Sequence, residues 1–233
     1  YRFSLTPETK NWRSISQAIT LTFPNKLEPN AKASYEWLIE NSENIILKFF
    51  LDNSGSKGAV ILNSIASVYK LSRLLKPLFE KYNLKVLVNT SLTGETERLQ
   101  SITEADLLIG TSTIDVGVDF KINFLVFEAS DAGNFIQRFG RLGRHPDFLP
   151  RPYQAYGLIP NFLVSRLFGE TGNLKDGEEC DRVSFNDAIR DNWSFVNQFE
   201  ATGGKFAGYR RSGAKGICAA GEFVATADAR GLS

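Results

Sequence analysis

The residues best suited to chemistry lie in the eight-residue run QRFGRLGR, which spans positions 137–144. It holds three arginines and two glycines behind a glutamine. Guanidinium groups pair with phosphate oxygens two at a time, and glycines leave the backbone open to a ligand. The run therefore predicts a polyanion as its ligand. The alternative interpretation is an arginine-rich helix in contact with solvent, whose surface ion pairs carry no function.

We expect this run to belong to a short helix over residues 134–144. Three of its long polar side chains then share one helical face: Gln137, Arg138 and Arg141. Gly140 removes side-chain bulk, so another surface can approach closely there. Gly143 stands where a helix commonly ends, and Arg144 would project from the exit turn.

Three more segments place small polar residues directly after apolar runs. GAVILNSIASV covers residues 58–68, SLTGETER covers 91–98, and GTSTIDVGVDF covers 110–120. Asn63 and Ser64 end the first apolar run and could donate to a phosphate. Ser91 opens the polar loop of the second segment, and the third combines the hydroxyls of Thr111 and Ser112 with Gly117 and the carboxylate of Asp119. Each segment also has a bland interpretation, because Thr111 could merely cap a helix and Asp119 could merely fix a loop.

Buried apolar runs alternate with helical periodicity along the middle of the chain. Strands are predicted at residues 59–62, 86–88, 107–109, 124–127 and 153–159. Helical periodicity is present at 35–50, 68–82, 161–168 and 191–199. This alternation predicts an α/β fold with a mostly parallel sheet flanked by helices. The polar residues after the strands should therefore meet at the carboxyl edge of that sheet.

The domain organisation follows from the same patterns. Residues 1–34 are polar and irregular, which predicts a linker or the end of a preceding domain. Residues 35–165 are expected to form the α/β domain, and 166–233 a smaller, partly irregular C-terminal extension. Because there is no methionine, we expect the chain to be part of a longer reading frame.

Composition narrows the function classes. The chain has 233 residues and is 42% hydrophobic and 23% charged. Its formal net charge is +1, so the overall charge does not by itself indicate nucleic-acid binding. One stretch is rich in basic residues and contains a single acidic residue, Glu80; its basic residues are Lys70, Arg73, Lys76, Lys81 and Lys85. Two distant cysteines, Cys180 and Cys218, disfavour a disulfide framework or zinc site and suit a reducing cytosol. Neither a signal peptide nor a membrane-length apolar run is present.

Taken in order, the four segments resemble motifs IV, IVa, V and VI of the C-terminal, RecA-like lobe of superfamily 2 helicases. The resemblance covers roughly residues 35–165, and QRFGRLGR is its most specific element. It implies that Arg141 and Arg144 act as arginine fingers on the γ-phosphate of ATP. It also implies that Gln137 and Arg138 link the helix to the opposite lobe, and that Gly117 and Asp119 lie at the nucleotide.

The resemblance assigns the hydroxyl and amide residues after the strands to nucleic acid. The implied contacts to the backbone phosphates of a single strand, expected to be DNA, come from Thr111, Ser112, Asn63, Ser64 and Ser91. Such contacts hold register without reading bases, as a motor on any sequence requires.

The sequence has no G-x-x-x-x-G-K-[ST] phosphate loop and no DEAD- or DEAH-type acidic box. We therefore expect ATP and Mg²⁺ to be bound mainly by an N-terminal RecA-like lobe outside this chain, which alone should be inactive. No metal-binding residue is expected within it.

Within the superfamily, residues 110–145 and the run YGLIPNFLVSRLF look most like the helicase of CRISPR type I interference, particularly type I-D. A single histidine, His145, cannot build an HD nuclease centre. This suits a helicase that works beside a separate nuclease subunit in an effector complex, and it equally suits a fragment that excludes the nuclease. The alternative function is a non-catalytic RecA-like module that docks nucleic acid or protein.

Overall fold

The protein is described from a computed structural model. The structure describes residues 2–5, 18–24, 27, 30–94, 96, 103–114, 121–143, 152–169, 172 and 174–201. For residues 3, 5 and 194–201, it describes the backbone alone.

One sheet runs through the molecule, with strand order β4-β5-β3-β6-β7-β2-β1-β8. The strands are β1 (Arg2–Leu5), β2 (Ile19–Thr22), β3 (Gly58–Ile61), β4 (Val86–Asn89), β5 (Leu107–Gly110), β6 (Phe124–Glu128), β7 (Tyr153–Leu158) and β8 (Glu179–Cys180). The six strands from β4 to β2 are parallel, β1 is antiparallel to β2, and β8 is parallel to β1. The predicted mostly parallel sheet flanked by helices is confirmed.

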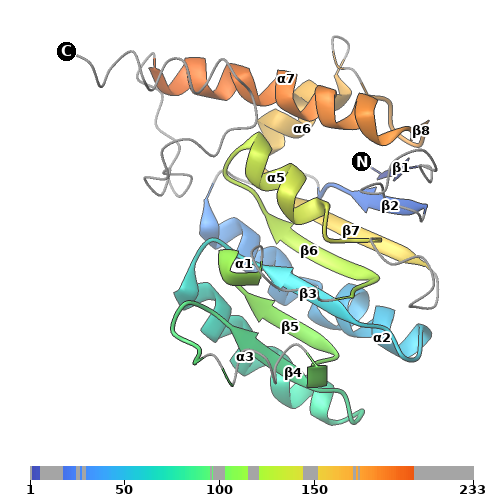
Figure 1. Ribbon diagram of the computed structural model, residues 1–233, viewed down its shortest axis with the longest axis vertical. Helices are drawn as coiled ribbons and strands as arrows, with labels where there is room; N and C mark the ends of the chain where they lie inside the picture. The colour runs from blue at the N-terminus through green and yellow to red at the C-terminus, as the bar shows by residue number, and fades with distance from the viewer. Residues whose placement is uncertain are drawn as a thin grey trace.

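Helices cover both faces of this sheet (Figure 1). They are α1 (Ala31–Glu40), the π-helical η1 (Ser42–Leu47), α2 (Lys48–Asp52), α3 (Ile65–Glu80), the 3₁₀ turn η2 (Ser112–Ile114), α5 (Ala132–Phe139), α6 (Asn161–Phe168) and α7 (Arg182–Ala201). The first face packs against α1, α2 and α3, and the second packs against α5, α6 and α7. None of the helices in the described ranges has the length and hydrophobicity needed to cross a membrane.

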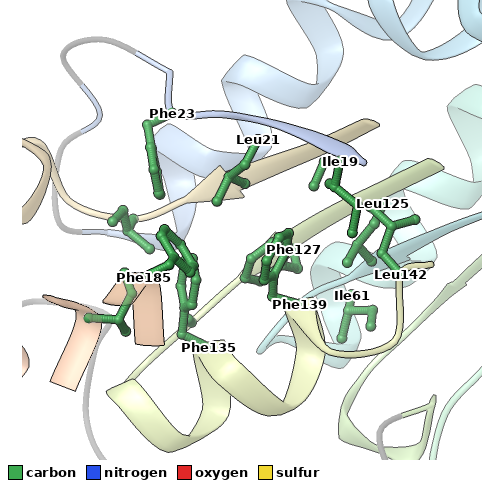
Figure 2. Close-up of a cluster of buried hydrophobic side chains, with 14 of the residues drawn as sticks. Ile19, Leu21, Phe23, Ile61, Leu125, Phe127, Phe135, Phe139, Leu142 and Phe185 are labelled. Atoms are coloured by element: carbon green, nitrogen blue, oxygen red, sulfur yellow. The ribbon is translucent and has the colours of Figure 1, made fainter. Parts of the chain in front are cut away.

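The core has two halves because successive side chains of a strand point to opposite faces of the sheet. In β3, Ala59 and Ile61 join the core under α5 to α7, whereas Val60 joins the core under α1 to α3. All four residues of β3 are buried, as are all five of β6, which explains why these strands read as continuous apolar runs. Figure 2 shows the core under α5 to α7, where side chains of β2, β6, α5 and α7 converge.

Three sequence predictions are corrected by this architecture. Residues 1–34 are not merely a linker, since β2 pairs with β7 and extends the parallel sheet. Ile19 and Leu21 of β2 are buried, 1% and 0% exposed, so this strand belongs to the core. The helix expected over residues 134–144 begins at Ala132 and ends at Phe139, and the one expected over 191–199 begins at Arg182.

Candidate functional site

The predicted phosphate-contacting segments follow neighbouring strands that end level with one another. Gly110 lies opposite both Asn89 and Ile61, and Ile61 lies opposite Phe127. The segments that leave β4, β5, β3 and β6 therefore emerge side by side at the carboxyl edge of the sheet. This edge has two parts of different character, which we call the arginine network and the hydroxyl edge.

The arginine network consists of Arg138, Asn63 and Glu128. The Arg138 guanidinium is buried, with the residue 2% exposed, and its Nη1 donates to the Asn63 side-chain oxygen at 2.7 Å and to the Glu128 carbonyl at 2.6 Å. The backbone N–H of Asn63 donates to Glu128 Oε2 at 2.6 Å. The network thus ties the α5 helix to the ends of β3 and β6.

Burial dominates the chemistry of Glu128, which is 3% exposed. Desolvation raises the pKa of its carboxyl group, because a buried anion loses its hydration. The N–H of Asn63, the Ser34 side chain and the positive charge of Arg138 oppose this rise in pKa. A buried carboxylate and a buried guanidinium therefore support each other beneath the edge.

This position changes the expected role of Arg138. The sequence predicts that Arg138 links α5 to an opposite lobe, but its side chain is directed into its own domain. Arg138 is 2% exposed, and its guanidinium is bonded to two strand ends of the same domain. Asn63 is likewise committed, since its side-chain oxygen accepts from Arg138.

The end of α5 determines how the remaining motif residues are presented. Asp131 caps the start of the helix by accepting from the Asn134 N–H at 2.7 Å. The helix ends at Phe139, and Gly143 adopts a φ of 73°, a left-handed conformation that favours glycine. Gln137 and Arg141 are therefore not one turn apart on a regular helix. Both are half-buried, and the Arg141 N–H donates to the Arg138 carbonyl at 3.0 Å.

The surface that approaches Gly140 comes from the C-terminal extension. A Cβ atom at this position would lie 3.1 Å from Nη2 of Arg182, the first residue of α7, and 2.9 Å from the carbonyl oxygen of Ile136. The Arg182 guanidinium also lies over the Phe139 ring, 5.4 Å from its centroid. The glycine therefore permits close packing between two helices of the same chain.

Aromatic rings strengthen the contact between α5 and α7 (Figure 2). Phe185 of α7 lies 5.6 Å from the Phe139 ring and 6.0 Å from the Phe135 ring, and Trp193 lies 5.6 Å from Phe135. Pairs at such distances contribute about 0.5–1.5 kcal/mol each beyond their burial. The α7 helix is thus an integral support of α5.

The hydroxyl edge comprises the residues after β4 and β5 together with Ser64. Ser91 and Ser112 are exposed, and Ser64 is half-buried and caps α3 by accepting from the Ser67 N–H at 3.3 Å. Thr111 is only 7% exposed. Of the predicted strand-contacting residues, Asn63, Ser91 and Ser112 are thus exposed, whereas Ser64 also caps a helix.

A buried amide lies directly behind this hydroxyl edge. Asn89 is 0% exposed, and neither its Nδ2 nor its Oδ1 has a hydrogen-bond partner among the residues that the structure describes. Its backbone oxygen, by contrast, accepts from the Thr113 hydroxyl at 3.1 Å and from the Thr111 N–H at 3.3 Å. Such an unsatisfied amide is uncommon in a protein core and costs stability.

Three predicted residues lie outside the described ranges: Gly117, Asp119 and Arg144. Among the residues that the structure does describe, no group of three or more His, Cys, Asp or Glu side chains could hold a metal ion.

Sequence reasoning missed three residues that shape the site. Glu128 reads as the last residue of an apolar strand, and its charge inside a buried run was the signal for a buried partner. Asn89 has a similar position at the end of β4. Arg182 lies 42 positions after Gly140 in sequence, and no local pattern connects the two.

Comparisons with known proteins agree with this architecture. Residues 54–147 match the family model described as CRISPR-associated nuclease/helicase Cas3, C-terminal. The crystal structure of T. fusca Cas3 is 13% identical with a TM-score of 0.54, over 79% of this chain and 26% of that chain. This chain thus corresponds to about a quarter of T. fusca Cas3. Among curated proteins, none matches.

Two further solved structures are similar at lower TM-scores. Mss116p DEAD-box helicase domain 2, bound to an RNA duplex, is 15% identical with a TM-score of 0.46, over 78% of this chain and 76% of that chain. The Pyrococcus furiosus Hef helicase domain is 23% identical with a TM-score of 0.38, over 52% of this chain and 25% of that chain.

The parallel sheet and its strand order have the RecA-like fold that the T. fusca Cas3 structure shares. Within that fold, the segment from residue 54 to residue 147 is similar to the C-terminal family of the CRISPR-associated nuclease/helicase Cas3.

Proposed function

We propose that this chain is the arginine-finger lobe of an ATP-dependent helicase or translocase that acts on DNA in a CRISPR type I system, with the I-D-like arrangement of a separate nuclease subunit. The observation that carries the proposal is that one arginine of QRFGRLGR is bonded inside its own domain. Arg138 is used inside the lobe, where it fixes α5 to two strand ends. We assign the finger role to the other two arginines of the run, Arg141 in the turn beyond the helix and Arg144 three positions later in the sequence.

In this function, Arg141 and Arg144 stabilise the negative charge that develops on the γ-phosphoryl group during transfer. Arginine fingers typically contribute about 10³–10⁵ in rate. Gln137 is half-buried on α5 and contacts the nucleotide or the opposite lobe, and Gly117 and Asp119 lie at the ribose. The first lobe supplies the cradle for the phosphates and for Mg²⁺, so ATP hydrolysis requires both lobes.

The hydroxyl edge holds the single strand. Ser91 follows β4 and Ser112 follows the neighbouring strand β5, and both are exposed. Ser64 and Thr111 complete the row at the carboxyl edge. Hydroxyl groups contact phosphate oxygens without distinguishing bases, which suits movement along any sequence. Asn63 contributes by holding the start of this row in place through Arg138.

The proposal is tested by Arg141→Ala in the full-length protein that carries this chain with its first lobe. We expect kcat for ATP hydrolysis to fall by about 10³-fold or more, while binding of single-stranded DNA stays nearly unchanged. Arg190→Ala is the matched control, because Arg190 lies on α7 and pairs with Asp187 at 3.1 Å. ATP turnover is compared with single-stranded DNA, with RNA and without polymer.

Wild-type turnover in Arg141→Ala would overturn the finger assignment. Absence of ATP hydrolysis in the wild-type full-length protein would instead favour the docking module. Stimulation by RNA and not by DNA would replace the proposed substrate.

A further inference from the structure

The outer face of α3 carries cations and exposed apolar side chains in alternation. Three neighbouring pairs recur along it: Tyr69 with Lys70, Leu74 with Arg73, and Tyr82 with Lys81 in the turn that follows the helix. Tyr69, Leu74 and Tyr82 are 38%, 37% and 50% exposed. The inner face of the same helix is buried through Val68, Leu71, Leu75 and Phe79, so the outer pairs are not needed for packing.

The cations of this face differ from other lysines of the molecule. Lys32, Lys48 and Lys175 each pair with a carboxylate three or four residues away, at 2.9–3.3 Å. Lys70, Arg73 and Lys81 form no ion pair within the described ranges, and Glu80 is the single acidic residue on α3. An uncompensated row of cations attracts a polyanion.

The position of α3 connects this row to the hydroxyl edge. Ser64 caps the helix at the carboxyl edge, and α3 runs from there along the sheet beside β4. With a rise of 1.5 Å per residue, Lys70 lies about 9 Å, Arg73 about 14 Å and Lys81 about 25 Å beyond Ser64 along the helix axis. Cations beside exposed rings form the surface that binds single strands, through phosphate attraction and base stacking.

We propose that the outer face of α3 continues the strand-binding site, so that a single strand leaving the hydroxyl edge follows Tyr69, Lys70, Arg73, Leu74, Lys81 and Tyr82. This inference rests on the proposed function, because it takes the hydroxyl edge as the start of the path. It extends that function by giving the strand a second, sequence-independent contact surface on the far side of Ser64.

The test measures binding of fluorescein-labelled oligo-dT to the full chain by fluorescence anisotropy between about 50 and 200 mM salt. Lys70→Ala/Lys81→Ala should make the slope of log K against log salt shallower by about 1.4, or 0.7 for each lost phosphate contact. The matched control is Lys48→Ala/Lys175→Ala, which removes the same charge from ion-paired sites and should leave the slope unchanged.

A second variant separates stacking from charge. Tyr69→Ala/Tyr82→Ala should weaken binding by about 30-fold or more and leave the salt slope at its wild-type value. Neither ring is part of a core cluster, so both variants should retain the wild-type unfolding transition.

The outcomes distinguish this inference from the function on which it rests. If Thr111→Ala weakens binding but both α3 variants behave as wild type, the α3 path is wrong and the strand site at the edge stands. If the wild-type chain binds no oligo-dT, both fail. If the α3 variants lose binding only to polyglutamate, the surface serves an acidic protein and the inference is overturned.

Discussion

The two parts of the carboxyl edge differ in burial and in hydrogen bonding. In the arginine network, Glu128 and Arg138 are both buried, and Asn63 bonds to each of them. In the hydroxyl edge, Ser91 and Ser112 are exposed, and the buried Asn89 behind them has an amide without partners in the described part of the chain. One part is rigidly cross-linked, and the other is open.

The difference matches the tasks proposed for the two parts. A finger that must meet a γ-phosphate needs fixed geometry, because a displacement of about 1 Å can cost a hundredfold in rate. A strand that advances through a motor needs contacts that form and break easily. Buried, fully bonded groups provide the first property, and exposed hydroxyls provide the second.

The largest effect should come from breaking the arginine network with Arg138→Met. Removing one partner leaves Glu128 buried without its positive charge and leaves the Asn63 side-chain oxygen without its donor. We expect the free energy of unfolding to fall by about 3–5 kcal/mol, measured by urea denaturation. Arg73→Met, on the exposed face of α3, is the control and should change stability by less than about 0.5 kcal/mol. An equal loss of unfolding free energy in the two variants would mean that the arginine network does not stabilise the fold more than an exposed arginine does.

The sequence predicted the sheet because its buried strands are strong local signals. β3 is apolar at every position and β6 at all but its last, Glu128, and α6 was predicted at the residues where it occurs, 161–168. β2 was missed because its four residues, with two buried positions, give too short an alternation. Its place is fixed by pairing with β7, more than a hundred residues later.

The site was predicted less completely, because the roles of its residues also depend on contacts between distant parts of the sequence. The order of motifs identified the carboxyl edge, and the register of β3, β5 and β4 brings those segments together. Sequence could not tell which arginine of QRFGRLGR turns inward. That choice depends on Asn63, 75 positions before Arg138, and on the burial of Glu128. Roles set by non-local burial are invisible to spacing alone.

A smaller effect, with the opposite sign, is expected at the hydroxyl edge for Asn89→Leu. Leucine has a similar shape and no polar atoms, so it removes two unsatisfied groups from a position that is 0% exposed. We expect the free energy of unfolding to rise by about 1 kcal/mol in urea denaturation. Asn63→Leu serves as the matched control in the arginine network and should destabilise, because that amide oxygen is bonded. Destabilisation by Asn89→Leu would show that its amide is satisfied in solution, and the contrast between the two parts would be lost.

The smallest effect is a change in pH dependence, and it sharpens the role of Glu128. Because burial raises the pKa of this carboxyl in the folded state, folding favours its protonated form. The stability that this contributes is fully present below the ordinary glutamate pKa near 4.5, and it is lost as pH rises through the higher folded-state pKa. Glu128→Gln cannot titrate, and its amide oxygen can still accept from the Asn63 N–H. We therefore expect the stability of the variant relative to wild type to increase with pH from about 4.5 upward, in urea unfolding at a series of pH values. Glu80→Gln, exposed on α3, should show no such trend. A relative stability that falls with pH would mean that Arg138 and Asn63 outweigh desolvation and hold the pKa of Glu128 below its ordinary value.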